Sequence, residues 1–122
     1  MTLQELYQSI GGDYEQALRV LRMDKLLDKH IRKLTNNGVV DALIEAGGSM
    51  EPERMFETAH AVKGVCGNLG LVTLSSAASE IAEEFRPGNQ RQHSDAWLSE
   101  KLDEISELYE KMKTGIAQYV GE

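Results

Sequence analysis

Apolar residues recur three and four positions apart along most of this chain, and no stretch shows the strict apolar–polar alternation that indicates a strand. Glycines, asparagines and Pro87 interrupt the helical pattern at a few places. The pattern therefore predicts an all-helical protein. We expect helices over about residues 2–10, 13–34 with a restart at Asp24, 39–46, 52–69, 71–85 and 94–120.

Local signals indicate where several of these helices begin. Thr2 can cap the first helix while Glu5 reaches back to it, which is a capping-box arrangement. Asp13 is a good cap for the second segment, and Pro52 suits the first position of a later helix. The last stretch, 94–120, has a broad apolar face, which favours packing in an antiparallel bundle.

Length and charge narrow the classes of function. A chain of 122 residues has the size of one domain, so we expect residues 1–122 to form a single unit with no room for a nucleotide-binding kinase domain. Thirteen basic against 20 acidic residues give a net charge of −7, which disfavours nucleic acid as the partner. No apolar run approaches the roughly 20 residues that span a bilayer, and the start lacks the basic residues of a signal peptide. We expect a cytoplasmic protein without membrane insertion.

The helix expected over 52–69 ends in an unusual run, Ala59-His60-Ala61-Val62-Lys63-Gly64-Val65-Cys66-Gly67-Asn68-Leu69-Gly70. Helical spacing puts His60, Lys63, Gly64 and Gly67 on one stripe. The opposite stripe is apolar and expected to be buried, and it consists of Met55, Ala59, Val62, Cys66 and Leu69. Each glycine inside a helix costs roughly 1 kcal/mol relative to alanine, so two beside a histidine need a reason. One such reason would be a need for exposed backbone beside a nucleophile. A free imidazole is largely neutral near pH 7, so a ring nitrogen can attack an electrophile while Lys63 screens the charge gained.

This run resembles the signature of histidine-containing phosphotransfer (HPt) domains, with a dense match from Ala59 to Leu71. The helix that follows and the Gly11-Gly12-Asp13 segment are also similar to the family. The resemblance implies an all-α fold: an antiparallel four-helix bundle core with additional short N-terminal helices. It further implies a phosphorelay intermediate of two-component signalling, in which a histidine carries a phosphoryl group between aspartates of receiver domains. Such modules have no kinase activity of their own.

Carried over to this chain, the resemblance makes His60 the phosphorylated residue, with Nε2 as the nucleophile. Lys63 would steady the phosphoryl oxygens, and Gly64 and Gly67 would let the loops of a receiver domain approach. One nucleophile and one cation suffice, because phosphoryl transfer depends mainly on positioning and on neutralising oxygen charge. The expected partners are response-regulator receiver domains or a hybrid histidine kinase. The receiver would supply the aspartate and the Mg²⁺, so we expect no cofactor or metal ion on this chain itself.

The other reactive side chains are expected to be structural. His30 and His93 have no partner at metal-ligand spacing, and we expect both to be structural or solvated. Cys66 is rotated away from the His60 stripe, so a small buried residue is expected rather than a thiol nucleophile. A single cysteine also cannot form a disulfide within the chain.

Two other features of the sequence, Phe56 and an acidic pair, also allow a structural interpretation. Phe56 comes one turn before His60 and is either a core residue or an exposed docking contact for a partner. The pair Glu83-Glu84 is most simply interpreted as a solvated helix face. Trp97 is expected to serve in packing.

Two other interpretations of function remain open. The chain could be the phosphotransfer domain excised from a larger hybrid or chemotaxis-type histidine kinase, whose own catalytic domain would phosphorylate His60. It could instead be a non-catalytic helical adaptor that binds a partner through Phe56, His60 and Gly64. A hydrolase is the weakest alternative, because nothing supplies a second acid, base or metal ion.

Overall fold

The structure, a computed structural model, describes residues 1–121, and this part of the chain contains helices and no strand. The all-helical fold expected from the sequence is confirmed, and the segment over 13–34 is divided into two helices. In chain order the seven helices of the described residues are α1 (Leu3–Ile10), α2 (Tyr14–Leu21), α3 (Asp24–Leu34), α4 (Val39–Ala46), α5 (Pro52–Asn68), α6 (Val72–Phe85) and α7 (Asp95–Val120).

The expected helix caps are present. The Thr2 side chain accepts from the Glu5 backbone amide while the Glu5 carboxylate accepts from the Thr2 amide, which completes the capping box of α1. Asp13 caps α2 by accepting from the Gln16 amide. Glu51 caps α5, and Pro52 occupies the first turn of that helix. These local contacts explain why the sequence located the helix starts.

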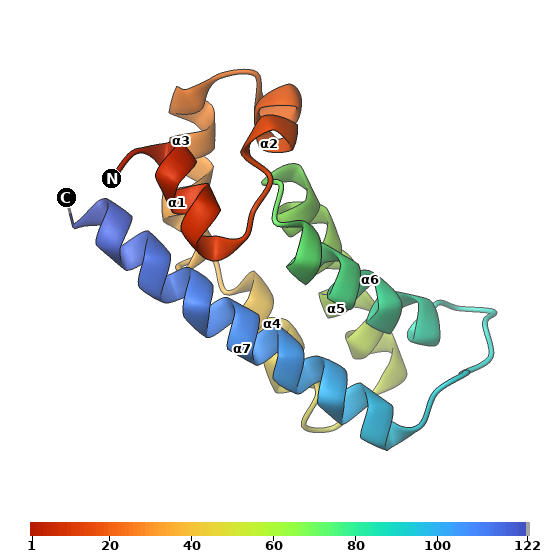
Figure 1. The fold of residues 1–122 in the computed structure, drawn as a ribbon. Coiled ribbons are helices and arrows are strands. Elements are labelled where there is room, and N and C mark those ends of the chain that lie inside the picture. Colours follow the sequence, from red (N-terminus) through yellow and green to blue (C-terminus); the bar gives the residue numbers. More distant parts are fainter. Residues whose placement is uncertain (122) are drawn as a thin grey trace.

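Helices α4, α5, α6 and α7 form the bundle. Helix α5 packs against α4 on one side and α6 on the other, and α7 contacts both α6 and α4. Helix α7 runs the length of the molecule, and α1, α2 and α3 gather at the end of the bundle where both chain termini lie (Figure 1). The short N-terminal helices thus cover one end of the bundle and leave much of α5 accessible.

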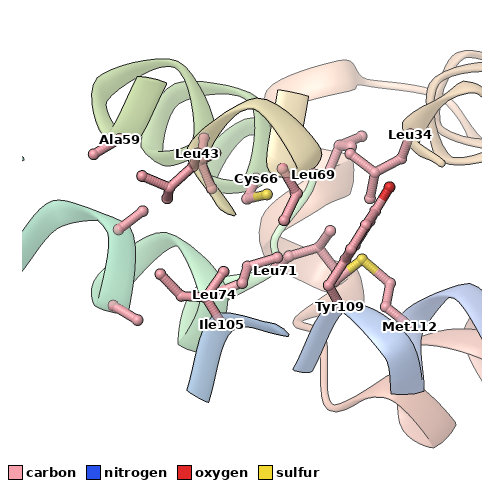
Figure 2. Close-up of a cluster of buried hydrophobic side chains, with 14 of the residues drawn as sticks. Leu34, Leu43, Ala59, Cys66, Leu69, Leu71, Leu74, Ile105, Tyr109 and Met112 are labelled. Carbon is pink, nitrogen blue, oxygen red and sulfur yellow. The ribbon is translucent and has the colours of Figure 1, made fainter. Parts of the chain in front are cut away.

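Buried side chains from several helices form one apolar core (Figure 2). On α5 the buried stripe is the expected one, and it consists of Met55, Ala59, Val62 and Cys66. Burial raises the pKa of the Cys66 thiol to about 12, so the thiol stays protonated and unreactive at neutral pH. The Tyr7 hydroxyl donates a 2.6 Å hydrogen bond to the Leu69 carbonyl and ties α1 to the end of α5.

A tight turn after α5 sends α6 back along it. Gly70 has φ +69°, a left-handed conformation that suits glycine, and its carbonyl accepts a 2.7 Å hydrogen bond from the Asp13 amide. One turn into α6, the Ser75 hydroxyl donates a 2.9 Å hydrogen bond to the Lys63 carbonyl. These contacts fix α6 beside the outward-facing side of α5.

The expectation that Glu83 and Glu84 both lie on a solvated face is wrong for Glu84, which is 5 % exposed. Its carboxylate accepts hydrogen bonds from the backbone amides of Gln92 and His93 and from Nδ1 of His93, at 2.6 Å for the ring nitrogen. The His93 ring in turn stacks on Trp97, with ring centroids 3.9 Å apart. Glu84 therefore holds the loop between α6 and α7 against the bundle.

Glu84 should make the stability of the fold depend on pH under acidic conditions. Burial opposes ionisation, but the hydrogen bonds from His93 and Gln92 outweigh it and lower the pKa of Glu84 from its ordinary value of 4.5. The stabilisation by the carboxylate is complete above that value and is lost as pH falls through the lower folded-state pKa. We expect Glu84→Gln to lower the thermal midpoint at pH 7 and to flatten its decline as the pH falls below 4.5. Circular dichroism melts check this, with exposed Glu100→Gln as the control, and equal pH profiles for the two variants would contradict the role of Glu84.

Candidate functional site

The outward side of α5 presents residues four positions apart as a single stripe, which we call the α5 stripe: Phe56, His60, Gly64 and Asn68. His60, Gly64 and Asn68 are exposed, and Phe56 is half-buried. The opposite side of the same helix is buried in the core. The amphipathic pattern of α5 thus fixes which way His60 points.

The His60 ring packs on Phe56. The two ring centroids are 5.6 Å apart with an interplanar angle of 22°, which is a stacked arrangement. Within residues 1–121, His60 has no hydrogen-bond or ion-pair partner, so both ring nitrogens are open to an incoming group. The stacking restricts the orientation of the ring while leaving its nucleophilic edge accessible.

Phe56 is also covered by a cation from the end of α6. The Arg86 guanidinium lies 5.7 Å from the centre of the Phe56 ring and forms a 2.7 Å ion pair with Glu83. Phe56 is half-buried: it packs against the core and stacks on the His60 ring, and its contact with a partner stays a prediction. No motif in the sequence indicated that Arg86 and Glu83 lie beside the site.

Lys63 lies one turn after His60 and is half-buried. Its ammonium has no ion-pair partner within 4.0 Å in the described part of the chain. The hydrogen bond from Arg86 is the largest effect that lowers the pKa of Glu83, and the positive charge of Lys63 adds to it. Lys63 is thus close enough to α6 to lower the pKa of Glu83, yet its ammonium remains available to bind an anion beside His60.

The two motif glycines have different surroundings. A Cβ atom added to Gly64 would meet no atom within 4 Å, so the backbone there is open to solvent. A Cβ on Gly67 would lie 3.2 Å from the Ser75 hydroxyl oxygen, because α6 packs against α5 at that point. Gly67 thus has a packing reason to be small, and its expected contact with a receiver stays a prediction.

The two remaining histidines lie away from His60. His30 is exposed on α3, and His93 belongs to the loop that Glu84 holds. The local arrangement at His60 can perform one kind of chemistry well: attack by a ring nitrogen on an electrophile whose oxygen charges a nearby cation neutralises.

Comparison with known protein families matches residues 2–115 of the chain to the Hpt domain. This protein therefore belongs to the Hpt domain family. Hpt domains are phosphocarrier modules of histidine phosphotransfer in two-component signalling, and they interact with receiver domains and kinases. Searches of curated proteins and of solved structures found no match. Among the described residues, no helix combines the length and the apolar character needed to cross a membrane.

Proposed function

We propose that this protein is a phosphorelay intermediate in which His60 accepts a phosphoryl group from a receiver-domain aspartate and passes it to a second receiver. The observation that carries the proposal is the geometry of the α5 stripe. Within residues 1–121, the exposed imidazole of His60 has no hydrogen-bonded partner and lies one turn from Lys63, which has no ion-pair partner there, and one turn from the open backbone of Gly64. Membership of the Hpt family supports the same role.

In the proposed reaction, the Nε2 lone pair of His60 attacks the phosphorus of the phosphoaspartate. The new nitrogen–phosphorus bond forms as the bond from phosphorus to the aspartate oxygen breaks, and the aspartate leaves as a free carboxylate. The ring gains positive charge, which is relieved when Nδ1 releases its proton to solvent. Lys63 attracts the phosphoryl oxygens during transfer, and the Mg²⁺ of the receiver would help to neutralise their negative charge.

Transfer from phosphorylated receivers is the direct test. Receiver domains from the same genome are labelled with radioactive acetyl phosphate, separated from it and mixed with the protein in the presence of Mg²⁺. We expect at least one receiver to lose label to the protein, with the acid-labile and alkali-stable behaviour of phosphohistidine. A protein that takes no label from any receiver would contradict the proposal. Incubation with radioactive ATP alone should give no label, because the proposed carrier has no kinase activity.

Lys63→Ala should slow phosphotransfer without unfolding the protein. The loss of one charge-assisted contact to the phosphoryl group, about 1.5 kcal/mol, corresponds to roughly ten-fold in rate. Helix stability should change little, since alanine is a good helix former and Lys63 has no ion-pair partner in the described residues. Single-turnover transfer from a phosphorylated receiver measures the effect, with Lys111→Ala on α7 as the matched control. Equal rates in the two variants would remove Lys63 from the site.

A further inference from the structure

Charge is distributed unevenly along this acidic chain. Residues 19–33 hold six basic residues and two acidic ones, a net charge of +4, whereas the whole chain has −7. All six are exposed on α2 and α3 or between them, and five of them make no side-chain contact with an acidic residue within residues 1–121. We call these five the basic strip: Arg19, Arg22, Lys25, Lys29 and Lys33.

No member of the basic strip makes an ion pair, a side-chain hydrogen bond or a ring contact within residues 1–121. The sixth basic residue, Arg32, differs because it pairs with Asp28. The two acidic residues of α3 are also occupied: Asp24 accepts from the Tyr14 hydroxyl and Asp28 from the Tyr119 hydroxyl. The two carboxylates offset only part of the positive charge, so the segment keeps its net charge of +4.

Most cations in the rest of the molecule behave differently. Four of the seven basic residues after Gly38 have acidic partners in the structure: Arg86, Arg91, Lys101 and Lys113. Unpaired positive charge is thus concentrated on the basic strip. Such a concentration attracts an acidic partner and raises its rate of association.

Exposed apolar side chains lie among these cations. Val20 is 47 % exposed, Met23 51 % and Leu26 38 %. They account for three of the six large apolar residues that are exposed in the described part of the chain. Apolar side chains surrounded by charged ones are typical of protein interfaces, where they form the contact area inside a polar rim.

A groove joins this surface to the α5 stripe. It has a volume of about 380 Å³ and is lined by Leu21, His30 and Lys33 on one side and by Val65 and Asn68 of α5 on the other. Asn68 belongs to the same stripe as His60 and lies eight residues after it, about 12 Å along the helix at 1.5 Å per residue. A domain of about 100 residues has a radius of gyration of about 13 Å, so one partner can cover both places.

We propose that the basic strip and the adjoining groove form the second half of the docking surface for a receiver domain, and that they select receivers whose docking face is acidic around an apolar centre. This inference rests on the proposed function. The unpaired positive charge of the basic strip favours a receiver that carries carboxylates on the part of its docking face that lies over the groove. The basic strip complements that charge, whereas the groove beside α6 is lined by Glu80 and Glu83 and would repel it.

Charge reversal at the groove is the first test. Lys33→Glu should lower kcat/KM for transfer from the preferred phosphorylated receiver about ten-fold at low salt, since changing an interface charge acts mainly on association. Lys111→Glu, an equal change at an exposed lysine of α7, should leave this value unchanged. Added salt should slow transfer to the wild-type protein more than transfer to Lys33→Glu. Equal rates and equal salt dependence in both variants would overturn the inference.

A small phosphoryl donor separates docking from chemistry. Phosphoramidate can phosphorylate an accessible histidine without a receiver, and we expect it to label the wild-type protein and Lys33→Glu at equal rates. If it labels both and the receiver also does not distinguish them, the docking inference fails while the proposed function stands. If neither phosphoramidate nor any receiver labels His60, the proposed function itself fails.

Arg22→Gly separates a loss of docking from a loss of folding. Arg22 ends α2 with φ +74°, a conformation that glycine adopts more readily than arginine. The variant should therefore keep or raise the thermal midpoint and still slow transfer from the receiver.

Sedimentation with vesicles of phosphatidylglycerol and phosphatidylcholine tests whether the basic strip binds a membrane instead of a receiver. Binding that Lys33→Glu abolishes, with receiver transfer unchanged, would assign the strip to a membrane and overturn the inference.

Discussion

Replacing His60 by glutamine should reduce phosphoryl acceptance by more than about a thousand-fold, because the reaction loses its nucleophile. Glutamine is polar and close to histidine in length, but its amide nitrogen has no free lone pair to attack phosphorus. Single-turnover transfer from a phosphorylated receiver provides the measurement. Acid-labile label that persists in His60→Gln would show that another residue carries the phosphoryl group.

The effect of this substitution on the fold should be small. His60 is exposed and has no hydrogen-bond partner within residues 1–121, so the replacement removes its stacking on Phe56 and little else. We expect a change in unfolding free energy within about 0.5 kcal/mol, as for other surface sites. Lys111→Gln should retain full transfer and is the matched control, because Lys111 is also an exposed helical residue but lies on α7, outside the α5 stripe and the basic strip.

The same pair of variants separates a carrier from an adaptor. A helical adaptor that binds through Phe56, His60 and Gly64 would take no phosphoryl group from a receiver. It would also keep pathway output in cells when His60 is replaced by glutamine. A phosphorelay intermediate would lose both the label and the output. Transfer in the purified system and output in cells must therefore change together if the proposed function holds.

Much of the fold could be predicted because its determinants are local. The Thr2–Glu5 capping box, the Asp13 cap and Pro52 act within one helical turn, so they are visible in the sequence itself. Glu84 could not be placed in the same way. Its burial depends on backbone amides of Gln92 and His93, which the loop after α6 brings back to that helix. The apolar pattern of α6 gives no sign of this contact.

The candidate site could also be predicted from the sequence in part. Helical spacing alone separates the side of α5 that carries His60 from the buried side. Spacing cannot show which part of the outward side a second helix covers. The sequence therefore could not predict that Gly64 is open while Gly67 faces Ser75. The tight turn at Gly70 offered a signal, because it implies that residues at similar distances from the turn along α5 and α6 meet, as do Phe56, 14 residues before Gly70, and Arg86, 16 residues after it. That register brings Arg86 to Phe56.

Gly70→Ala should produce the largest loss of stability among the glycine substitutions considered. The left-handed conformation at Gly70 costs alanine about 1–2 kcal/mol. An added Cβ would also lie far inside contact distance of the Asp13 carbonyl oxygen. Because the crowding atom belongs to the backbone, relief requires the α1–α2 connection to move, which strains the hydrogen bond from the Asp13 amide to Gly70, worth about 1 kcal/mol. We expect a total of about 3 kcal/mol in urea unfolding, a large share of the 5–15 kcal/mol of a typical domain.

Gly64→Ala is the matched control, and its expected effect has the opposite sign. Gly64 lies inside α5, and an added Cβ meets no atom within 4 Å, so alanine should stabilise the protein by up to about 1 kcal/mol through helix propensity. A glycine retained where alanine is more stable indicates that something other than folding limits the side chain there. If Gly64→Ala is more stable and also slower in transfer from a receiver, the open backbone beside His60 serves docking. If Gly70→Ala unfolds at the same urea concentration as Gly64→Ala, the contact between Gly70 and Asp13 does not determine the α5–α6 turn.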